Sequence, residues 1–528
     1  MNHREWAVSS KIVDLSHTNV GAVARENSAR SEAGNLRRLH RLKPGGFTIS
    51  AFRNSATARW WALAVLALTQ LVVVLDGTIV AIALPQAQQQ LGMGDGERQW
   101  VITAYTLAFG ALLLIGGRIA DYWGRKRTFM VGMVGFGIAS VWGGLAQTGL
   151  ELILARGVQG AFAALLAPAA LSMVTVLFAH GRERNIAFAI WGLVAGTGAA
   201  IGLLLGGLLT EFADWRWCLL VNIFFVAIGL IGGWLLLDES TTEGDNRYDI
   251  VGTILITAGL GALVYGFTLA EHGWGSLDTI GFIALGVVLI VGFGWSQTRI
   301  AQPLLPLRVI LHKVRGGALI VQAITGATML GAMLYTNFYM QIVLGMSPLW
   351  TGVGNVVMTV AIVLMTPVST KILGRFGPRW LMVAGPAIVA VGLFMFAGVQ
   401  ADGSYWTHAL PGFVVMGIGF SGIFVPLQNL ALAGVESRDA GVASGVVNSV
   451  FHVGGALGLA VFTVAYTSVS SNALGEGATT LVAFTSGYSA AFLIAGVAML
   501  LAALAALALI RGTKEQLLPS VEAVPAGH

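Results

Sequence analysis

Two charged residues lie inside stretches of the chain that are otherwise apolar. Asp76 interrupts one apolar run and Arg156 interrupts a later one. An ionised side chain at the centre of a membrane helix costs roughly 2.5 to 3.5 kcal/mol, so such residues pair, face the protein interior or exchange a proton. Arginine keeps its proton at any useful pH. The pattern predicts proton exchange at Asp76 and a fixed cation at Arg156.

Two simpler interpretations stay open for these residues. Asp76 could be a structural acid that is hydrogen-bonded to its neighbours. Arg156 could extend its long side chain to the membrane surface.

A short basic turn with one acid is the third feature that could do chemistry. It joins two apolar stretches and runs Gly116-Gly117-Arg118-Ile119-Ala120-Asp121-Tyr122-Trp123-Gly124-Arg125-Lys126-Arg127. Glycine lets helix ends approach closely, and lysine and arginine mark the cytoplasmic side of a membrane protein. We interpret this turn as a conformational switch formed by Gly117, Asp121, Gly124, Arg125 and Lys126. A topology signal alone is the simpler interpretation.

The elements that must position these residues are membrane helices. Hydrophobic residues make up 56% of the 528 residues and charged residues only 10%, whereas soluble domains carry about 25% charged residues. The mean hydropathy is +0.78. The formal net charge of +5 is divided between an N-terminal tail and short loops, so it indicates membrane orientation and argues against nucleic-acid binding.

Cysteine content and catalytic motifs exclude several classes of function. Cys218 is the single cysteine, so the chain can form no internal disulfide and has no cysteine cluster for a metal. No nucleophile and base stand together, and no phosphate-binding loop of the ATPase type is present. We predict no enzymatic activity, no metal, no cofactor and an ion gradient as the energy source.

The apolar stretches predict fourteen membrane spans when about 20 apolar residues are taken as one crossing. Alternate loops hold 15 lysines and arginines on one side, against Arg98 and Arg216 on the other. The positive-inside rule then places both termini in the cytoplasm. Arg156 is the one basic residue that we place within a span. The predicted spans are 60–84, 99–117, 128–147, 150–178, 185–209, 217–237, 250–270, 279–298, 316–344, 348–370, 380–399, 405–434, 441–467 and 487–510.

A second copy of the basic turn divides the chain into repeats. The segment 371–379 follows the tenth span as the first turn follows the second, with Gly377 at the position of Gly124. We predict one six-helix bundle over 60–237 and another over 316–510. Between them, 238–315 would form an acidic linker, an inserted pair of helices and a connecting loop. The remaining residues, 1–59 and 511–528, are predicted to be cytoplasmic tails, the first basic and mostly disordered.

Small and polar residues inside the spans predict contact faces. Gly198, Gly202 and Gly206 are spaced four apart, so they would line one face of a helix and allow close packing. Other polar and aromatic residues could line an adaptable substrate cavity, although uncharged polar groups also join helices and packing is the simpler role of His452. These cavity candidates are Tyr105, Trp191, Tyr335, Asn337, Tyr339, Gln341, Gln428, Asn448 and His452.

The basic turn and the segments around Asp76 and Arg156 resemble motifs of the major facilitator superfamily, in particular of its 14-helix drug:proton antiporters. The resemblance covers residues 60–510. It implies an all-α integral membrane protein with the major facilitator fold, two six-helix bundles and two inserted helices. One departure concerns the fifth span, where the antiporter signature usually has a proline after a glycine and this chain has Ala199 after Gly198.

The same resemblance implies proton-coupled efflux of lipophilic, often cationic drugs or secondary metabolites by alternating access. Substrate sites in such transporters lie between the repeats near mid-membrane, and Asp76 and Arg156 would couple transport to protons. Export of one endogenous metabolite or lipid, and proton-coupled uptake, are the alternatives. A non-transporting sensor would require both residues to be dispensable. We expect a monomer in the plasma membrane, with substrate, protons and membrane lipid as its partners.

Overall fold

The computed structural model describes residues 56–179, 181–241, 248–270, 273–300, 302–432 and 440–512, together with Leu517. Every regular element in these ranges is a helix. The prediction of a disordered basic tail lies almost wholly outside the described residues, as does most of the predicted C-terminal tail.

The first six crossings are built from seven helices, of which α8 and α9 together form the sixth. The helices extend past the predicted spans. After residue 84, for example, α3 continues past Pro85 through four glutamines, which hydropathy excludes from a span but which form helix well. These helices are α3 (Ala56–Leu91), α4 (Asp95–Trp123), α5 (Arg125–Gly144), α6 (Gly149–Leu177), α7 (Gly181–Phe212), α8 (Trp217–Leu220) and α9 (Asn222–Leu236).

Two inserted helices and a second set of six crossings follow. The hairpin of α10 and α11 comes first, and π-helical turns extend the crossings of α13 and α16. The elements are α10 (Ile250–Leu269), α11 (Leu277–Gln297), α12 (Leu307–Ile310), α13 (Lys313–Phe338), η2 (Tyr339–Val343), α14 (Pro348–Phe376), α15 (Pro378–Ala397), η3 (Tyr405–Ala409), α16 (Leu410–Leu432), α17 (Ala440–Gly475) and α18 (Thr480–Leu509).

Thirteen helices within the described ranges are long and apolar enough to cross a membrane. The remaining predicted crossing is α5, which has 20 residues but begins with three basic residues and contains five glycines. These residues lower its apolar character without shortening it. With α5 included, the described helices account for the fourteen predicted spans.

Both copies of the repeated turn contain a glycine with positive φ between their two helices. Gly124 separates α4 from α5 with φ +121°, and Gly377 separates α14 from α15 with φ +79°. Residues with a side chain rarely adopt such angles. Glycine is therefore required at the two positions that the repeat aligned.

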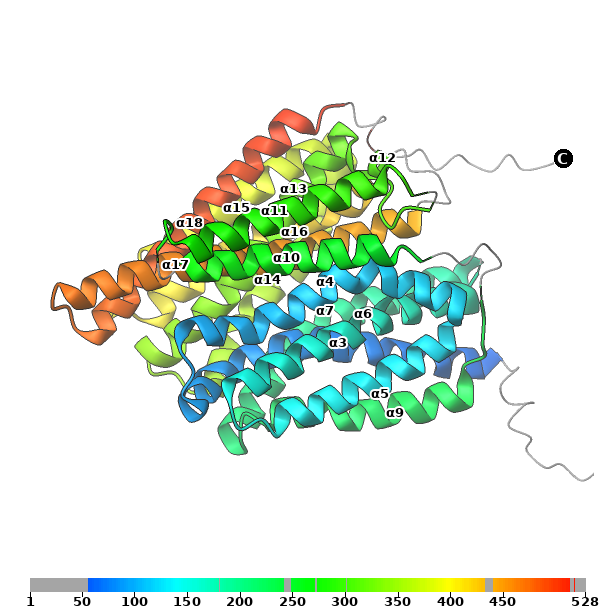
Figure 1. The fold of residues 1–528 in the computed structure, drawn as a ribbon, viewed down its shortest axis with the longest axis horizontal. Helices are drawn as coiled ribbons and strands as arrows, with labels where there is room; N and C mark the ends of the chain where they lie inside the picture. Colours follow the sequence, from blue (N-terminus) through cyan, green and yellow to red (C-terminus); the bar gives the residue numbers. More distant parts are fainter. Residues whose placement is uncertain are drawn as a thin grey trace, which may run out of the picture. The chain divides into compact units, whose positions relative to one another are not determined.

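Two helix pairs join the first set of crossings to the second, α4 with α17 and α7 with α14. We call these sets the first half (α3 to α9) and the second half (α13 to α18). The hairpin of α10 and α11 contacts both α4 and α17 through α10 (Figure 1). Its apolar contact includes Val264 of α10, Leu107 of α4 and Ala456 of α17. The inserted pair therefore packs on the line where the two halves meet.

Large apolar side chains are exposed along many helices. Trp234 on α9, Val288 and Trp295 on α11, and Leu364 on α14 are each 64–70% exposed. A water-soluble protein rarely leaves apolar surface of this extent uncovered, whereas lipid is a suitable solvent for it. The chain is a multi-pass membrane protein.

Candidate functional site

Asp76 and Arg156 form an ion pair inside the first half. Asp76 lies on α3 and Arg156 on α6, with 2.5 Å between Asp76 Oδ2 and an Arg156 Nη atom. The two side chains are 0% and 1% exposed. Arg156 Nε also donates to the Val101 carbonyl at 3.3 Å. The arginine therefore points into the protein and does not reach the membrane surface.

Three uncharged residues complete the hydrogen bonding around the ion pair. Gln159 Nε2 and Asn222 Nδ2 each donate to Asp76 Oδ1 at 2.8 Å, and Gln159 Oε1 accepts from Arg156 at 2.6 Å. The Ser140 hydroxyl accepts from Gln159 at 2.8 Å. We call Asp76, Arg156, Gln159, Asn222 and Ser140 the charge network. It joins α3, α5, α6 and α9.

Tyr105 covers the arginine side of the charge network. Its ring centroid lies 4.2 Å from the Arg156 guanidinium carbon, which is a cation–π contact. Its hydroxyl donates to the Val73 carbonyl of α3 at 3.3 Å. Gly160 allows this arrangement, because a Cβ there would lie 2.3 Å from the Tyr105 carbonyl oxygen. Tyr105, predicted as a cavity residue, is thus part of the wall around Arg156.

The glycine face of α7 lies against α3 on the turn that carries Asp76. A Cβ at Gly202 would meet the Leu75 carbonyl oxygen at 2.9 Å, and one at Gly206 would meet the Ile79 carbonyl oxygen at 2.9 Å. Gly198 faces the side chains of Leu71 and Val74. The three predicted packing glycines therefore hold α7 close to the helix that carries the acid.

The basic turn is held to the end of α9 and the loop after it. Lys126 Nζ donates to the Leu237 carbonyl at 2.7 Å, and the backbone N–H of Lys126 donates to Glu239 at 3.1 Å. Asp121 pairs with Arg125 at 3.0 Å, and its side chain is 43% exposed. A Cβ at Gly117 would make only ordinary contact, whereas one at its neighbour Gly116 would lie 2.1 Å from the Ala164 carbonyl oxygen. The close approach of α4 to α6 occurs at Gly116, which the motif reading did not single out.

Several other predicted cavity residues contact different parts of the protein. Asn337 accepts from Asn355 at 2.8 Å, Gln341 donates to the Ile82 carbonyl at 3.1 Å, and Asn448 donates to the Ser444 carbonyl at 3.1 Å. Trp191 packs on the core of the first half. The ring centroid of His452 lies 4.5 Å from that of Phe109. The side chain of Gln428 lies outside the described part of the chain.

Arg98 is a functional candidate that the sequence reading missed. We predicted that it lies in an external loop, but it stands on the first turn of α4 and is 3% exposed. Hydropathy ended the span at residue 99 because this helix begins with polar residues. Arg98 is therefore, like Arg156, a buried arginine on a helix long and apolar enough to cross a membrane.

Rings of the second half surround Arg98. Its guanidinium carbon lies 4.3 Å from the ring centroid of Phe338 and 4.8 Å from that of Tyr466. Tyr335 and Tyr488 stack beside Tyr466, with centroid separations of 5.6 and 5.0 Å. We call Tyr335, Phe338, Tyr466 and Tyr488 the aromatic cage. It contains one of the predicted cavity residues and borders Tyr339, whose ring centroid lies 6.5 Å from that of Tyr488.

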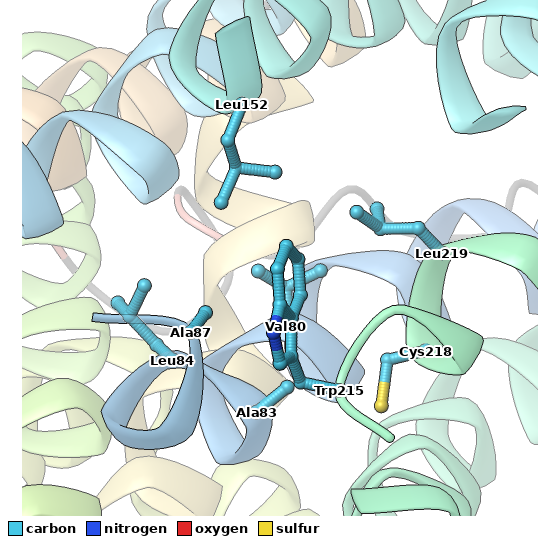
Figure 2. A pocket seen from close by; sticks show the side chains of 8 residues that line it. All are labelled: Val80, Ala83, Leu84, Ala87, Leu152, Trp215, Cys218 and Leu219. Carbon is cyan, nitrogen blue, oxygen red and sulfur yellow. The ribbon is translucent and has the colours of Figure 1, made fainter. Parts of the chain in front are cut away.

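Two cavities lie apart from the charge network and the cage. Figure 2 shows an apolar pocket of about 10 Å³ lined by Val80, Ala83, Leu84, Ala87, Leu152, Trp215, Cys218 and Leu219, which is about the room of one water molecule. The other cavity has a volume of about 460 Å³ and is lined by Val399, Gln400, Ala401, Asp402, Val482, Thr485, Ser486 and Ser489. None of the predicted cavity residues lines either one.

Comparison with known proteins adds a family and relatives. The sequence model of the Major Facilitator Superfamily matches residues 66–459. The chain is 43% identical to the puromycin resistance protein pur8 of Streptomyces alboniger over 87% of this chain and 92% of that one. It is 36% identical to the cephamycin export protein CmcT of Amycolatopsis lactamdurans over 86% of this chain and 93% of that one.

A solved structure resembles the fold as well. A bacterial homologue of the human lysosomal transporter Spinster, in an inward-facing and unoccupied conformation, matches with a TM-score of 0.61. It covers 87% of this chain and 98% of its own, at 17% identity. At this identity the match shows a common fold and no more.

Proposed function

Since the chain belongs to the major facilitator superfamily, we propose that it exports lipophilic, often cationic small molecules in exchange for protons. The observation that carries the proposal is the buried ion pair of Asp76 and Arg156. A membrane helix that only needed packing would not bury this pair, because desolvating two charges is costly. Its relatives are named for resistance to puromycin and export of cephamycin, which supports outward transport.

The charge network is arranged to hold Asp76 as a carboxylate. Its two oxygens receive three hydrogen bonds, from Arg156, Gln159 and Asn222. A proton on the carboxyl group would be a hydrogen-bond donor that faces the donors of these three residues. It would also remove the charge that holds Arg156. Protonation of Asp76 therefore releases the arginine, and deprotonation captures it again.

Asn222 can serve both protonation states. Its Nδ2 donates to the carboxylate, and its Oδ1 is buried with no hydrogen-bond partner. A half-turn of the amide exchanges the two atoms, so that Oδ1 accepts from a protonated Asp76. The network then keeps a hydrogen bond to Asp76 in either state.

The two halves are joined by hydrogen bonds at the end of the protein that we predict to lie outside the cell. Glu211 of α7 accepts from the Ser347 hydroxyl at 2.6 Å and from the Leu349 N–H at 2.9 Å. Gln341 donates to the Ile82 carbonyl at the same end. These contacts support a conformation that is closed to the outside. Asp121 pairs here within its own turn, and we propose that it contacts α17 when the cytoplasmic end closes.

Asp76→Asn tests the proposal. The parent and the variant are reconstituted into proteoliposomes, and puromycin-driven proton release is measured. Puromycin is the probe because the relative at 43% identity is named for it. We expect the variant to lose coupled exchange and to make puromycin accumulation in a pump-deficient host insensitive to a protonophore. Normal coupled exchange in Asp76→Asn would overturn the proposal.

A dedicated exporter of one metabolite is the second candidate. It is favoured by the name of the second relative, which refers to export of cephamycin. Accumulation across a panel of structurally unrelated antibiotics separates the two, because a dedicated exporter lowers the level of one compound class.

A further inference from the structure

The aromatic cage of the second half encloses a positive charge that belongs to the first half. Its rings come from three helices: Tyr335 and Phe338 from α13, Tyr466 from α17 and Tyr488 from α18. Arg98 comes from α4 and lies over the faces of Phe338 and Tyr466. All of these side chains are at most 3% exposed.

The second half recognises this charge through its rings. The carboxylate that pairs with Arg98 is Asp95, on the same helix, at 2.7 Å, and Gln88 of α3 accepts a longer bond at 3.4 Å. In the described ranges, Arg98 Nη2 and the hydroxyls of Tyr466 and Tyr488 form no hydrogen bond of ordinary geometry. A cage of this kind needs no donor on its ligand, so it suits an alkylated ammonium as well as a guanidinium.

Cage and occupant lie on different halves, so any separation of the halves at this end must draw Arg98 out of the cage. The ring faces then border the space between the halves, which leads to the mid-membrane region where transporters of this architecture hold their substrates. We propose that the aromatic cage is a binding site for organic cations, and that Arg98 is the tethered cation that fills it while this end is closed. The inference rests on the proposed function, since a substrate reaches the cage through alternating access.

A tethered occupant competes with a free ligand for the same rings. Removing the charge of Arg98 should therefore strengthen binding of an organic cation, whereas Arg98→Lys keeps a competitor. Arg98→Gln alone also leaves Asp95 without its partner, and that acid would attract a cation by itself. The double variant Asp95→Asn/Arg98→Gln removes both charges and keeps the net charge of the parent.

The experiment measures equilibrium binding of tetraphenylphosphonium to the full chain in phosphatidylcholine nanodiscs, with no proton gradient. We expect Asp95→Asn/Arg98→Gln to bind about fivefold more tightly than the parent, which is within the range of cation–π energies. Tyr466→Leu and Tyr488→Leu, on two different helices, should each weaken binding, and Tyr466→Phe should bind as the parent does. Each variant must elute as a single species in size-exclusion chromatography.

Two results would overturn the inference. One is a double variant that binds no more tightly than the parent, and the other is unchanged binding after both leucine substitutions. Neither depends on coupling, because no gradient is present and Asp76 is intact in every variant. If the cage binds the cation while Asp76→Asn still exchanges protons, the inference stands and the proposed function fails.

Discussion

The Arg156 guanidinium contacts several groups at once, and these contacts determine the effect of a substitution at this position. It bonds Asp76 and Gln159, donates to the Val101 carbonyl and lies over the ring of Tyr105. A lysine ammonium is a compact charge and cannot form the same planar set of contacts. We therefore expect Arg156→Lys to keep only part of the transport activity.

Removing the cation tests the pair directly. Arg156→Gln leaves the Asp76 carboxylate buried without its partner, and breaking a buried pair in this way costs about 3–5 kcal/mol. Asp76→Asn/Arg156→Gln removes both charges and should regain most of that loss. Thermal unfolding in detergent, followed by tryptophan fluorescence, measures both. If Arg156→Gln is as stable as the parent, the ion pair contributes little to the free energy of unfolding.

At the scale of helices, glycines decide how closely the network is held. Gly202 is buried against the backbone of α3, whereas Gly196, on the same helix, has nothing within 4 Å of an added Cβ. We therefore expect alanine to destabilise the protein at Gly202 and not at Gly196.

Gly202→Ala should lower the stability by about 1–3 kcal/mol, because overpacking forces α7 away from the helix that carries Asp76. Gly196→Ala should be neutral or stabilise by up to about 1 kcal/mol, since alanine favours a helix over glycine. Melting temperature and proton-coupled exchange are measured together. Equal effects of the two substitutions would contradict the contact between α7 and α3.

The inserted hairpin is tied to the first half more firmly than a peripheral pair would be. Arg118 of α4 donates to the carbonyls of Gln302 and Pro303, which follow α11. A second contact joins α4 to α10, where the ring centroids of Trp100 and Tyr265 lie 6.2 Å apart. We infer that the hairpin moves with α4 when the halves rock.

Arg118→Ala should release the segment after α11. We expect faster hydrogen exchange over residues 302–306 and a transport rate lowered severalfold, because the hairpin loses its attachment to α4. Arg127→Ala is the matched control, since that side chain is 65% exposed and its partner Glu239 is 3.6 Å away. Unchanged exchange in Arg118→Ala would mean that the attachment does not depend on this arginine.

At the scale of the whole transporter, we infer that a few polar contacts between the halves close the end that the predicted topology puts outside the cell. Glu211 receives two hydrogen bonds from the start of α14, and Arg98 enters the aromatic cage near the same end. The contacts between α4 and α17 are largely apolar, as where Gly445 faces Leu114. Small apolar contacts allow the two halves to rock against each other, whereas the polar contacts stabilise the conformation in which this end is closed.

Glu211→Gln should shift the population toward a conformation open to the outside. Spin labels on α7 and α14 near this end, read by double electron–electron resonance, should show a longer distance. Glu151→Gln is the control, because Glu151 lies at the same end but caps α6 within the first half, accepting from Gln147 N–H at 2.7 Å. A distance distribution that matches the parent would remove Glu211 from the outer gate.

The sequence by itself determined the helices and their number, and it singled out Asp76 and Arg156, which the structure pairs. Burying a charge in an apolar helix is so costly that a charged residue in one apolar segment already indicates a special role. Only the tertiary structure decided the partners. Asn222 reaches Asp76, and Ser140 reaches Gln159 and Asn222, because α5 and α9 pack beside the pair. Neither residue differs locally from an ordinary polar residue. Arg98 looked like a loop residue because α4 begins with polar residues, and the rings that contact it come from helices far along the chain. Hydropathy averages a residue with its neighbours in sequence. The aromatic cage, by contrast, forms from side chains that meet only when the helices pack.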